Sequence, residues 1–269
     1  MVKNKKLDGN LDNIKIIDNN NFICLKNKTE LIQISVKSGN QKSIFNFGEK
    51  IDKILYYINK YITKGEEAKN KRYSIKVWET LSNNNHTQLV TEIIFPYKEL
   101  FRFEGILYLV PDKNFFIYSG KMGDGENATY FFNLKAYEIE NKIEDYEIDN
   151  ISRLNDNLLI FSKYDYIYNC DSYLNIYDIS KKNIVGNKTF EFTINSIEII
   201  PKKEIILISG YNGEYSDIHI FDYNFKEIQT LKKTNFGSIV GMKFYEKNEN
   251  EDLILSFSED GTINILSFY

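Results

Sequence analysis

Histidine and cysteine, the residue types most used in nucleophilic and metal chemistry, are scarce in this chain, and its 38 Asp and Glu residues are not paired at recognisable spacings. The chain contains two histidines, His86 and His219, and two cysteines, Cys24 and Cys170. These four residues show none of the close Cys/His spacings that predict a zinc site. No serine stands in the Gly-x-Ser-x-Gly pattern that exposes a hydrolase nucleophile. The sequence therefore favours a protein that is not an enzyme and that holds no metal and no cofactor.

Two stretches offer a chemical alternative. The glycine-rich run 120–125 is similar to a phosphate-cradling loop, but it lacks the spacing of a P-loop and no helical pattern follows it. A loop between two strands is the favoured interpretation. Asp165 and Asp171 flank a tyrosine-rich loop and could form a general acid/base pair, although a solvated loop is again favoured.

A run of acidic residues crosses the middle of the chain. Such a run is most often a solvated face, and its functional alternative is a docking patch for a basic partner. Its members are Glu138, Glu140, Glu144, Asp145, Glu147 and Asp149.

The elements that position these residues are best seen at the end of the sequence. Two apolar runs, Leu253–Phe257 and Ile263–Phe268, flank a short polar stretch that contains Asp260-Gly261. Asp-Gly between two alternating apolar runs is a strong hairpin signal, because the favoured turn needs positive φ at its central residues. The sequence therefore predicts a β-hairpin here.

Two patterns recur along the chain with the period of that hairpin. In the first, alternating apolar residues lead to an aromatic slot, which we place at positions 35, 78, 137, 177, 221 and 266. In the second, two apolar residues stand three apart, as in Leu11/Ile14, Ile51/Ile54, Phe103/Ile106, Ile148/Ile151, Ile194/Ile197 and Ile239/Met242. A repeat of about 40–45 residues with four strands per unit is typical of propeller blades.

The residues at the slot resemble those of a known family. Ile75-Lys76-Val77-Trp78-Glu79, Tyr177-Asp178 and Phe221-Asp222 resemble the end of the third strand in WD-repeat β-propellers. The chain is identified as a degenerate member, because the Gly-His dipeptide that opens family repeats is absent. The family's Trp-Ser-His-Asp hydrogen-bond network is therefore predicted not to form, and apolar packing is expected to stabilise the blades instead.

We accordingly predict an all-β fold with one β-propeller domain, 1–269, made of six four-stranded blades. The last blade lacks a fourth strand, so the N-terminal segment 2–8 is expected to complete it; the alternatives are an open or short-edged blade and a strand supplied by a partner. The predicted blades are 11–48, 49–97, 98–148, 149–193, 194–235 and 236–269, with 1–10 before the first.

Composition limits the partners. The net charge of −4 speaks against a general nucleic-acid binder. No run reaches transmembrane length, so no membrane insertion is expected, and the first residues show no apolar leader. Two cysteines form no disulfide framework and are expected to be buried thiols. We expect a cytoplasmic protein, with the nucleus as the alternative.

One periodic position could bind a partner. It directly follows the first apolar residue of each first strand, and by resemblance to WD-repeat rings it lies near the mouth of the central channel. Acids here would form a collar suited to a peptide with Lys or Arg, whereas the alternative is that they cap local backbone N–H groups. The residues are Asp12, Asp52, Glu104, Asp149 and Asn195, with Val240 in the last repeat.

The favoured function is a non-catalytic scaffold or adaptor for protein–protein interaction, a subunit of a larger complex that binds partner proteins through its loops and channel mouth. Partners with basic segments are expected. The alternative is a propeller that binds a small ligand or acts as an enzyme, which would require convergent polar groups in a pocket.

Overall fold

The computed structural model describes residues 11–57, 60–67, 72–81, 86–94, 106–122, 126–144, 147–164, 172–248 and 251–268. These residues are almost entirely strand, and two short 3-10 helices, η1 (Pro111–Lys113) and η2 (Pro201–Lys203), interrupt them. The prediction of an all-β fold is confirmed. Within the described ranges, no helix has the length and apolar character needed to cross a membrane.

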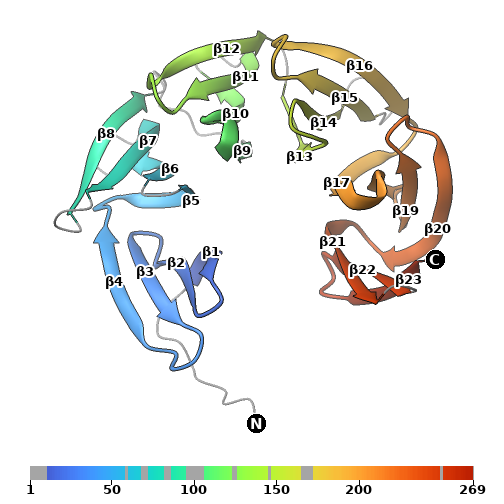
Figure 1. Cartoon of the computed structure of the whole chain (residues 1–269), viewed down its shortest axis with the longest axis horizontal. Helices are drawn as coiled ribbons and strands as arrows, with labels where there is room; N and C mark the ends of the chain where they lie inside the picture. Colours follow the sequence, from blue (N-terminus) through green and yellow to red (C-terminus); the bar gives the residue numbers. More distant parts are fainter. Residues whose placement is uncertain are drawn as a thin grey trace. The chain divides into compact units, whose positions relative to one another are not determined.

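The strands form six antiparallel sheets in which sequence neighbours pair (Figure 1). Three sheets belong to a first compact unit, Met1–Glu144. Their strands are β1 (Leu11–Asp18), β2 (Asn21–Lys26), β3 (Glu30–Ser35) and β4 (Gln41–Asn46); β5 (Lys50–Tyr57), β6 (Lys60–Glu67), β7 (Arg72–Leu81) and β8 (His86–Ile94); and β9 (Ile106–Val110), β10 (Phe115–Met122), β11 (Glu126–Asn133) and β12 (Glu138–Glu144).

The other three sheets form a second compact unit, Asp145–Tyr269. Their strands are β13 (Asn150–Arg153), β14 (Leu158–Tyr164), β15 (Ser172–Asp178) and β16 (Asn183–Phe190); β17 (Thr193–Ile200), β18 (Ile205–Tyr211), β19 (Tyr215–Asp222) and β20 (Glu227–Phe236); and β21 (Ile239–Asn248), β22 (Glu251–Ser258) and β23 (Ile263–Phe268).

The prediction of six successive sheets is confirmed. Five of them have four strands and the last has three among the described residues. Segment 2–8, expected to complete that sheet, lies outside the described residues, so its role stays a prediction. The division of 1–269 into one domain with the blade limits given above also stays a prediction.

The C-terminal hairpin is confirmed, with a longer turn than a two-residue loop. The Ser258 N–H donates to the Thr262 carbonyl and the Gly261 N–H donates to the Ser258 carbonyl, each at 3.0 Å. Of the two central residues, only Gly261 adopts a left-handed conformation, with φ of 84°. The carboxylate of Asp260 instead accepts the Thr262 N–H at 2.8 Å, which fixes the turn.

The register of the sheets corrects the aromatic slot. In four sheets the pairing of the third strand with the fourth shifts by one residue directly before the slot, at Trp78, Phe132, Tyr177 and Phe221. The slot of the third sheet is therefore Phe132 and not Tyr137, which lies in the following turn with φ of 58°. The sequence misled us because Tyr137 continues the apolar alternation past the end of β11 at Asn133.

In three of these sheets the slot residue, Phe132, Tyr177 or Phe221, is the second-last residue of its strand, and the last residue caps the turn that follows, whereas β7 continues for three residues beyond Trp78. The Asn133 side chain accepts the N–H groups of Lys135 (2.8 Å) and Ala136 (3.0 Å). In the first sheet the register shift lies earlier, between Leu31 and Ile32, so the register does not test the slot at position 35, which stays a prediction. Because the cap stops the strand, the slot position is set by the turn as well as by apolar alternation.

The acid of the aromatic–acid pair has the same capping role. Asp178 accepts the Ser180 N–H at 2.9 Å and the Lys181 N–H at 3.0 Å. The hydroxyl of Ser180 also donates to this carboxylate, and these bonds together hold the pKa of Asp178 below its usual value. Asp222 caps the equivalent turn after β19.

Apolar packing joins successive sheets within each unit. In the second unit, Ile160 and Leu174 of one sheet pack with Ile206 and Phe221 of the next, all buried. Equivalent clusters join the next pair of sheets in that unit and both pairs in the first unit. The sheets therefore stack face to face, as expected for blades.

Polar pairs also stabilise the first unit, so the expectation of apolar packing in place of a hydrogen-bond network is incomplete. The indole N–H of Trp78 donates to the Thr63 hydroxyl at 2.8 Å in the interior. The Lys76 ammonium, with a side chain only 10% exposed, pairs with Glu49 and lies 3.2 Å from Glu92. Burial lowers the pKa of Lys76. The combined effect of the Glu49 and Glu92 carboxylates raises it by more, so the net shift is upward.

Candidate partner-binding site

The periodic position that the sequence singled out has a structural cause, which is a β-bulge at the start of the first strand. In β5, β17 and β21 the pairing with the second strand skips one residue. The skipped residues are Asp52, Asn195 and Val240. A bulge re-aims its side chain and increases the twist of the strand, so these positions present their side chains differently from the rest of the ladder.

Asp149 takes the equivalent place before β13. Its N–H donates to the Ser162 carbonyl at 2.9 Å, while Ser162 is also the register partner of Asn150. Two consecutive residues therefore face one residue of β14, as in a bulge. The side chain of Asp149 is exposed.

The two remaining predicted residues fit less well. The register shift in β1 falls after Asp12, between Asp12 and Lys15, and the side chain of Asp12 is not described. Glu104 lies outside the described residues.

Charge around Asp52 is mixed. The Asp52 side chain is 31% exposed, and its carboxylate lies 4.0 Å from the Lys50 ammonium. Lys53 follows the bulge and lies opposite Lys64 in β6, which is buried. Burial lowers the pKa of Lys53. At this bulge of the first unit, Asp52 therefore lies between two lysines, Lys50 and Lys53. The sequence predicted acidic residues here and did not predict the lysines beside them.

In the second unit, the first strands of neighbouring sheets are joined by side chains. Asn150 Nδ2 donates to the Ile194 carbonyl at 3.0 Å, and the Ser152 hydroxyl donates to the Ile197 carbonyl at 3.1 Å. These bonds hold β13 against β17 and so place Asp149 and Asn195 at adjacent bulges. The Nδ2 atom of Asn195 is buried and has no hydrogen-bond partner among the described residues.

Serine hydroxyls, which the sequence did not single out, anchor these strand starts. Ser172 accepts the Ile194 N–H at 2.9 Å, and Ser216 accepts the Ile239 N–H at 3.2 Å. Both serines are buried at the beginning of a third strand. The N–H groups beside the bulges are thus capped by the preceding sheet, and the spacing of these serines from the aromatic slot, five residues before it, was the available signal.

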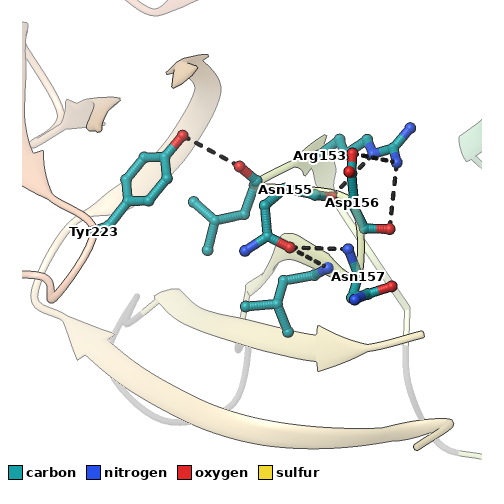
Figure 2. A network of polar contacts seen from close by, with 7 residues as sticks. Arg153, Asn155, Asp156, Asn157 and Tyr223 are labelled. Carbon is teal, nitrogen blue, oxygen red and sulfur yellow. Dashed lines mark hydrogen bonds and ion pairs between the residues drawn. The ribbon is translucent and has the colours of Figure 1, made fainter. Parts of the chain in front are cut away.

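The other end of β13 is held by a polar network (Figure 2). Figure 2 shows the Asn155 side chain accepting the N–H groups of Asn157 and Leu158, both at 2.9 Å. Arg153 Nη2 lies 3.2 Å from the Asp156 carboxylate. From the next sheet, the Tyr223 hydroxyl donates to the Leu154 carbonyl at 3.2 Å. The bulged end of β13 therefore belongs to a strand fixed at both ends.

Of the residues considered for chemistry, the two whose side chains are described, Cys24 and His219, show no catalytic arrangement. Asp165, Asp171 and Cys170 lie outside the described residues, and Cys24 is a buried thiol whose pKa is raised by burial. His219 stacks on Phe192 with ring centroids 4.4 Å apart. In the parts that the structure describes, no three His, Cys, Asp or Glu residues are placed to hold a metal ion.

The glycine-rich run is part of a hairpin. Gly120 to Met122 belong to β10, and β11 begins at Glu126, with residues 123–125 outside the described ranges. The two strands pair along their whole length. The run therefore begins inside β10 and leads to a second strand, and the helix that would follow a P-loop is absent from the described residues after it.

Comparisons with protein-family models and with curated proteins found no match. Solved structures match over nearly the whole chain. A chain in a structure titled "Crystal Structure of Mitotic Checkpoint Complex" gives a TM-score of 0.63 at 10% identity, covering 96% of this chain and 74% of that one. Sqt1 of Saccharomyces cerevisiae gives 0.56 at 9% identity, covering 93% and 81%.

A third match, the Dos1 propeller, gives a TM-score of 0.61 at 14% identity and covers 96% of this chain and 68% of that one. All three are WD40 β-propellers. Identities this low carry information on architecture and not on activity. Together with the six successive meander sheets, they show that this chain has the fold of a WD40-type β-propeller.

Proposed function

We propose that this protein is a non-catalytic scaffold and that bulged starts of its first strands, within each unit, bind partner proteins. Its structural neighbours include a chain from the mitotic checkpoint complex, a protein assembly. Propellers of this kind support an interaction role in general terms. The partner, the contact residues and the absence of catalysis are our proposal.

The observation that carries the proposal is the rigid bulge beside Asp149. Its carboxylate is exposed, whereas the strand behind it is tied to the next sheet through Asn150 and Ser152. A charged side chain on a fixed backbone loses little conformational freedom when it binds, which favours affinity. The complementary group is a lysine or arginine of the partner.

The charges near Asp52 refine the expected ligand. Because Lys50 and Lys53 accompany this carboxylate, a uniformly basic peptide would meet repulsion in the first unit. A segment that alternates basic and acidic residues fits better. We also propose a reducing intracellular compartment, since Cys24 is a free thiol.

The test compares two charge-reversal pairs in the full chain. Tagged protein is recovered from its native cells, co-purifying proteins are identified, and the affinity of the main partner is then measured with purified components. The variant Asp52→Lys/Asp149→Lys should weaken binding at least tenfold, about 1.4 kcal/mol. The control variant Asp112→Lys/Glu204→Lys reverses two exposed acids in the turns that follow β9 and β17, at the ends of these strands opposite their starts, and should bind as the parent does.

Equal affinities for both variants would overturn the proposed site. Failure of the parent chain to retain any protein would overturn the scaffold itself. Turnover of a small molecule by the purified chain would overturn its non-catalytic character.

A further inference from the structure

The last sheet of the second unit ends at an edge that the other sheets do not have. Among the described residues, β23 pairs only with β22. In every other sheet the third strand also pairs with a fourth, as β19 does with β20 (Figure 1). A row of backbone N–H and C=O groups on β23 is therefore available for pairing with an added strand.

The composition of β23 is that of an interior strand. Its sequence, Ile263–Phe268, contains no charged residue. All five fourth strands, which are true edges, carry charges that discourage edge-to-edge pairing. These are Lys42 in β4, Glu92 in β8, Glu138, Glu140, Lys142 and Glu144 in β12, Lys188 in β16, and Glu227, Lys232 and Lys233 in β20.

Exposure of β23 differs from that of its counterpart in the preceding sheet. Ile218 and Ile220 of β19, three and one residues before the slot, are fully buried. Ile263 and Ile265 hold the same places in β23 and are 59% and 65% exposed. Ile218 and Ile220 are covered both by Leu231 of the fourth strand β20 and by Ile239 and Met242 of the following sheet. A fourth strand beside β23 would therefore cover this apolar face in part.

The edge is also held in a fixed geometry. Asn264 Nδ2 donates to the Thr234 carbonyl of β20. The Ser256 hydroxyl of β22 donates to the Asn235 side chain at 2.7 Å, in the interior. Because β20 of the preceding sheet positions both strands, an added strand would pair with an edge that is already ordered, which lowers the entropic cost of binding.

We propose that β23 binds an extended segment of a separate protein as an antiparallel fourth strand. The segment would run about six residues, with its backbone paired to β23 and with apolar side chains beside Ile263 and Ile265. The chain's own residues 1–10 suit this place poorly. Five of the seven residues from Val2 to Asp8 are Lys, Asn or Asp, which are depleted from strands.

This inference adds a second contact to the proposed scaffold and uses none of the bulge residues. Loss of binding on reversal of Asp52 and Asp149 would therefore leave it untouched, and its own failure would leave the bulge site untouched. The bulge site and the β23 edge are therefore tested by different variants, and each can fail without the other.

The first measurement is hydrogen exchange of the full chain and of a chain that lacks residues 1–10, with mass determined by light scattering. We expect the β23 amides to exchange at least tenfold faster than those of β19 in both chains, and both chains to be monomers. Protection that disappears when residues 1–10 are removed would overturn the proposal in favour of closure by the chain itself. Protection in a dimer would overturn it in favour of a second copy.

The second measurement adds a strand. The probe is the synthetic peptide of residues 183–190, which forms the natural fourth strand β16 in this chain. At millimolar concentration it should slow exchange of the β23 amides at least tenfold and leave β19 unchanged. No slowing would overturn the proposal.

A matched pair of variants assigns the effect to the edge. Ile265→Lys should abolish protection by the peptide, because it places a charge beside the added strand. Ile228→Lys changes an equally exposed isoleucine of β20, 54% exposed against 65%, and should leave protection intact. Equal protection in both variants would show that the peptide binds elsewhere and would overturn the proposal.

Discussion

Breaking the buried ion cluster of Lys76, Glu49 and Glu92 should strongly destabilise the first unit. Substitution of Lys76 by Met removes the cation and leaves two carboxylates, of which Glu49 is only 9% exposed. Removal of one partner from a buried ion pair costs about 3–5 kcal/mol. For a unit of this size, each kcal/mol corresponds to roughly 2–4 °C in Tm, so a decrease of about 6–20 °C is expected.

Urea denaturation followed by tryptophan fluorescence measures this effect directly. Trp78 is the one tryptophan of the chain and is buried in the first unit, so its signal reports that unit alone. The matched control is Lys142→Met, which removes a lysine whose partner, Glu144, is 75% exposed. An exposed pair contributes no more than about 1 kcal/mol.

The same cluster predicts a dependence on pH. The folded pKa of Lys76 is raised above its ordinary value of 10.5. Its contribution to stability is therefore complete below pH 10.5 and is lost as the pH rises through the folded pKa. The difference in unfolding free energy between the parent chain and Lys76→Met should therefore shrink as the pH rises through the folded pKa of Lys76.

Two results would refute this reasoning. One is a loss below about 1 kcal/mol for Lys76→Met at neutral pH, which would mean that the cluster is hydrated and weak. The other is an alkaline limb that is the same in both proteins. The double variant Glu49→Met/Lys76→Met should recover much of the loss, because apolar residues can replace a buried ion pair at little cost.

Three further outcomes follow from the packing. Thr63→Val should cost about 1–3 kcal/mol, because it leaves the buried indole N–H of Trp78 without its acceptor; urea denaturation measures the loss, and an unchanged midpoint would contradict it. Gly210→Ala should destabilise the second unit by about 1–3 kcal/mol, since an added Cβ would lie 2.7 Å from the Phe192 ring; calorimetry tests this, and Phe192→Leu should restore part of the loss. Asp178 has a lowered pKa, so its contribution is present above its ordinary value of 3.8 and is lost as the pH falls through the folded pKa; Asp178→Asn should flatten the acid limb of stability, and an identical limb would show that its capping bonds contribute nothing.

Local patterns in the amino-acid sequence were sufficient to predict the all-β class, the six repeats and the C-terminal hairpin. Apolar alternation and Asp-Gly act over a few residues, and each can be read without knowing what lies opposite in space. The bulge position was visible too, because it recurs at the same distance from an apolar residue. Its physical cause was not visible, since a bulge is a relation between two strands.

The register within each sheet and the contacts between sheets were decided by the tertiary structure. The third slot is Phe132 because the register shift with β12 and the Asn133 cap place it there, whereas the sequence alone favoured Tyr137. The hydroxyls of Ser172 and Ser216 accept N–H groups of residues that lie 22 and 23 positions later in the chain, respectively.

The charged residues give the clearest division. In the sequence, Lys76 occupies a polar position of an alternating strand, which is typical of a solvent-facing side chain. Only the packing of the fold brings Glu49, 27 residues before it, within reach of its ammonium. Conversely, Lys53 and Lys64 stand on separate strands and become neighbours through pairing of β5 with β6. Strand periodicity is a property of neighbouring residues, so it is visible in the sequence. Ion pairs, burial and register depend on residues that are distant in the chain and that only the folded structure brings together.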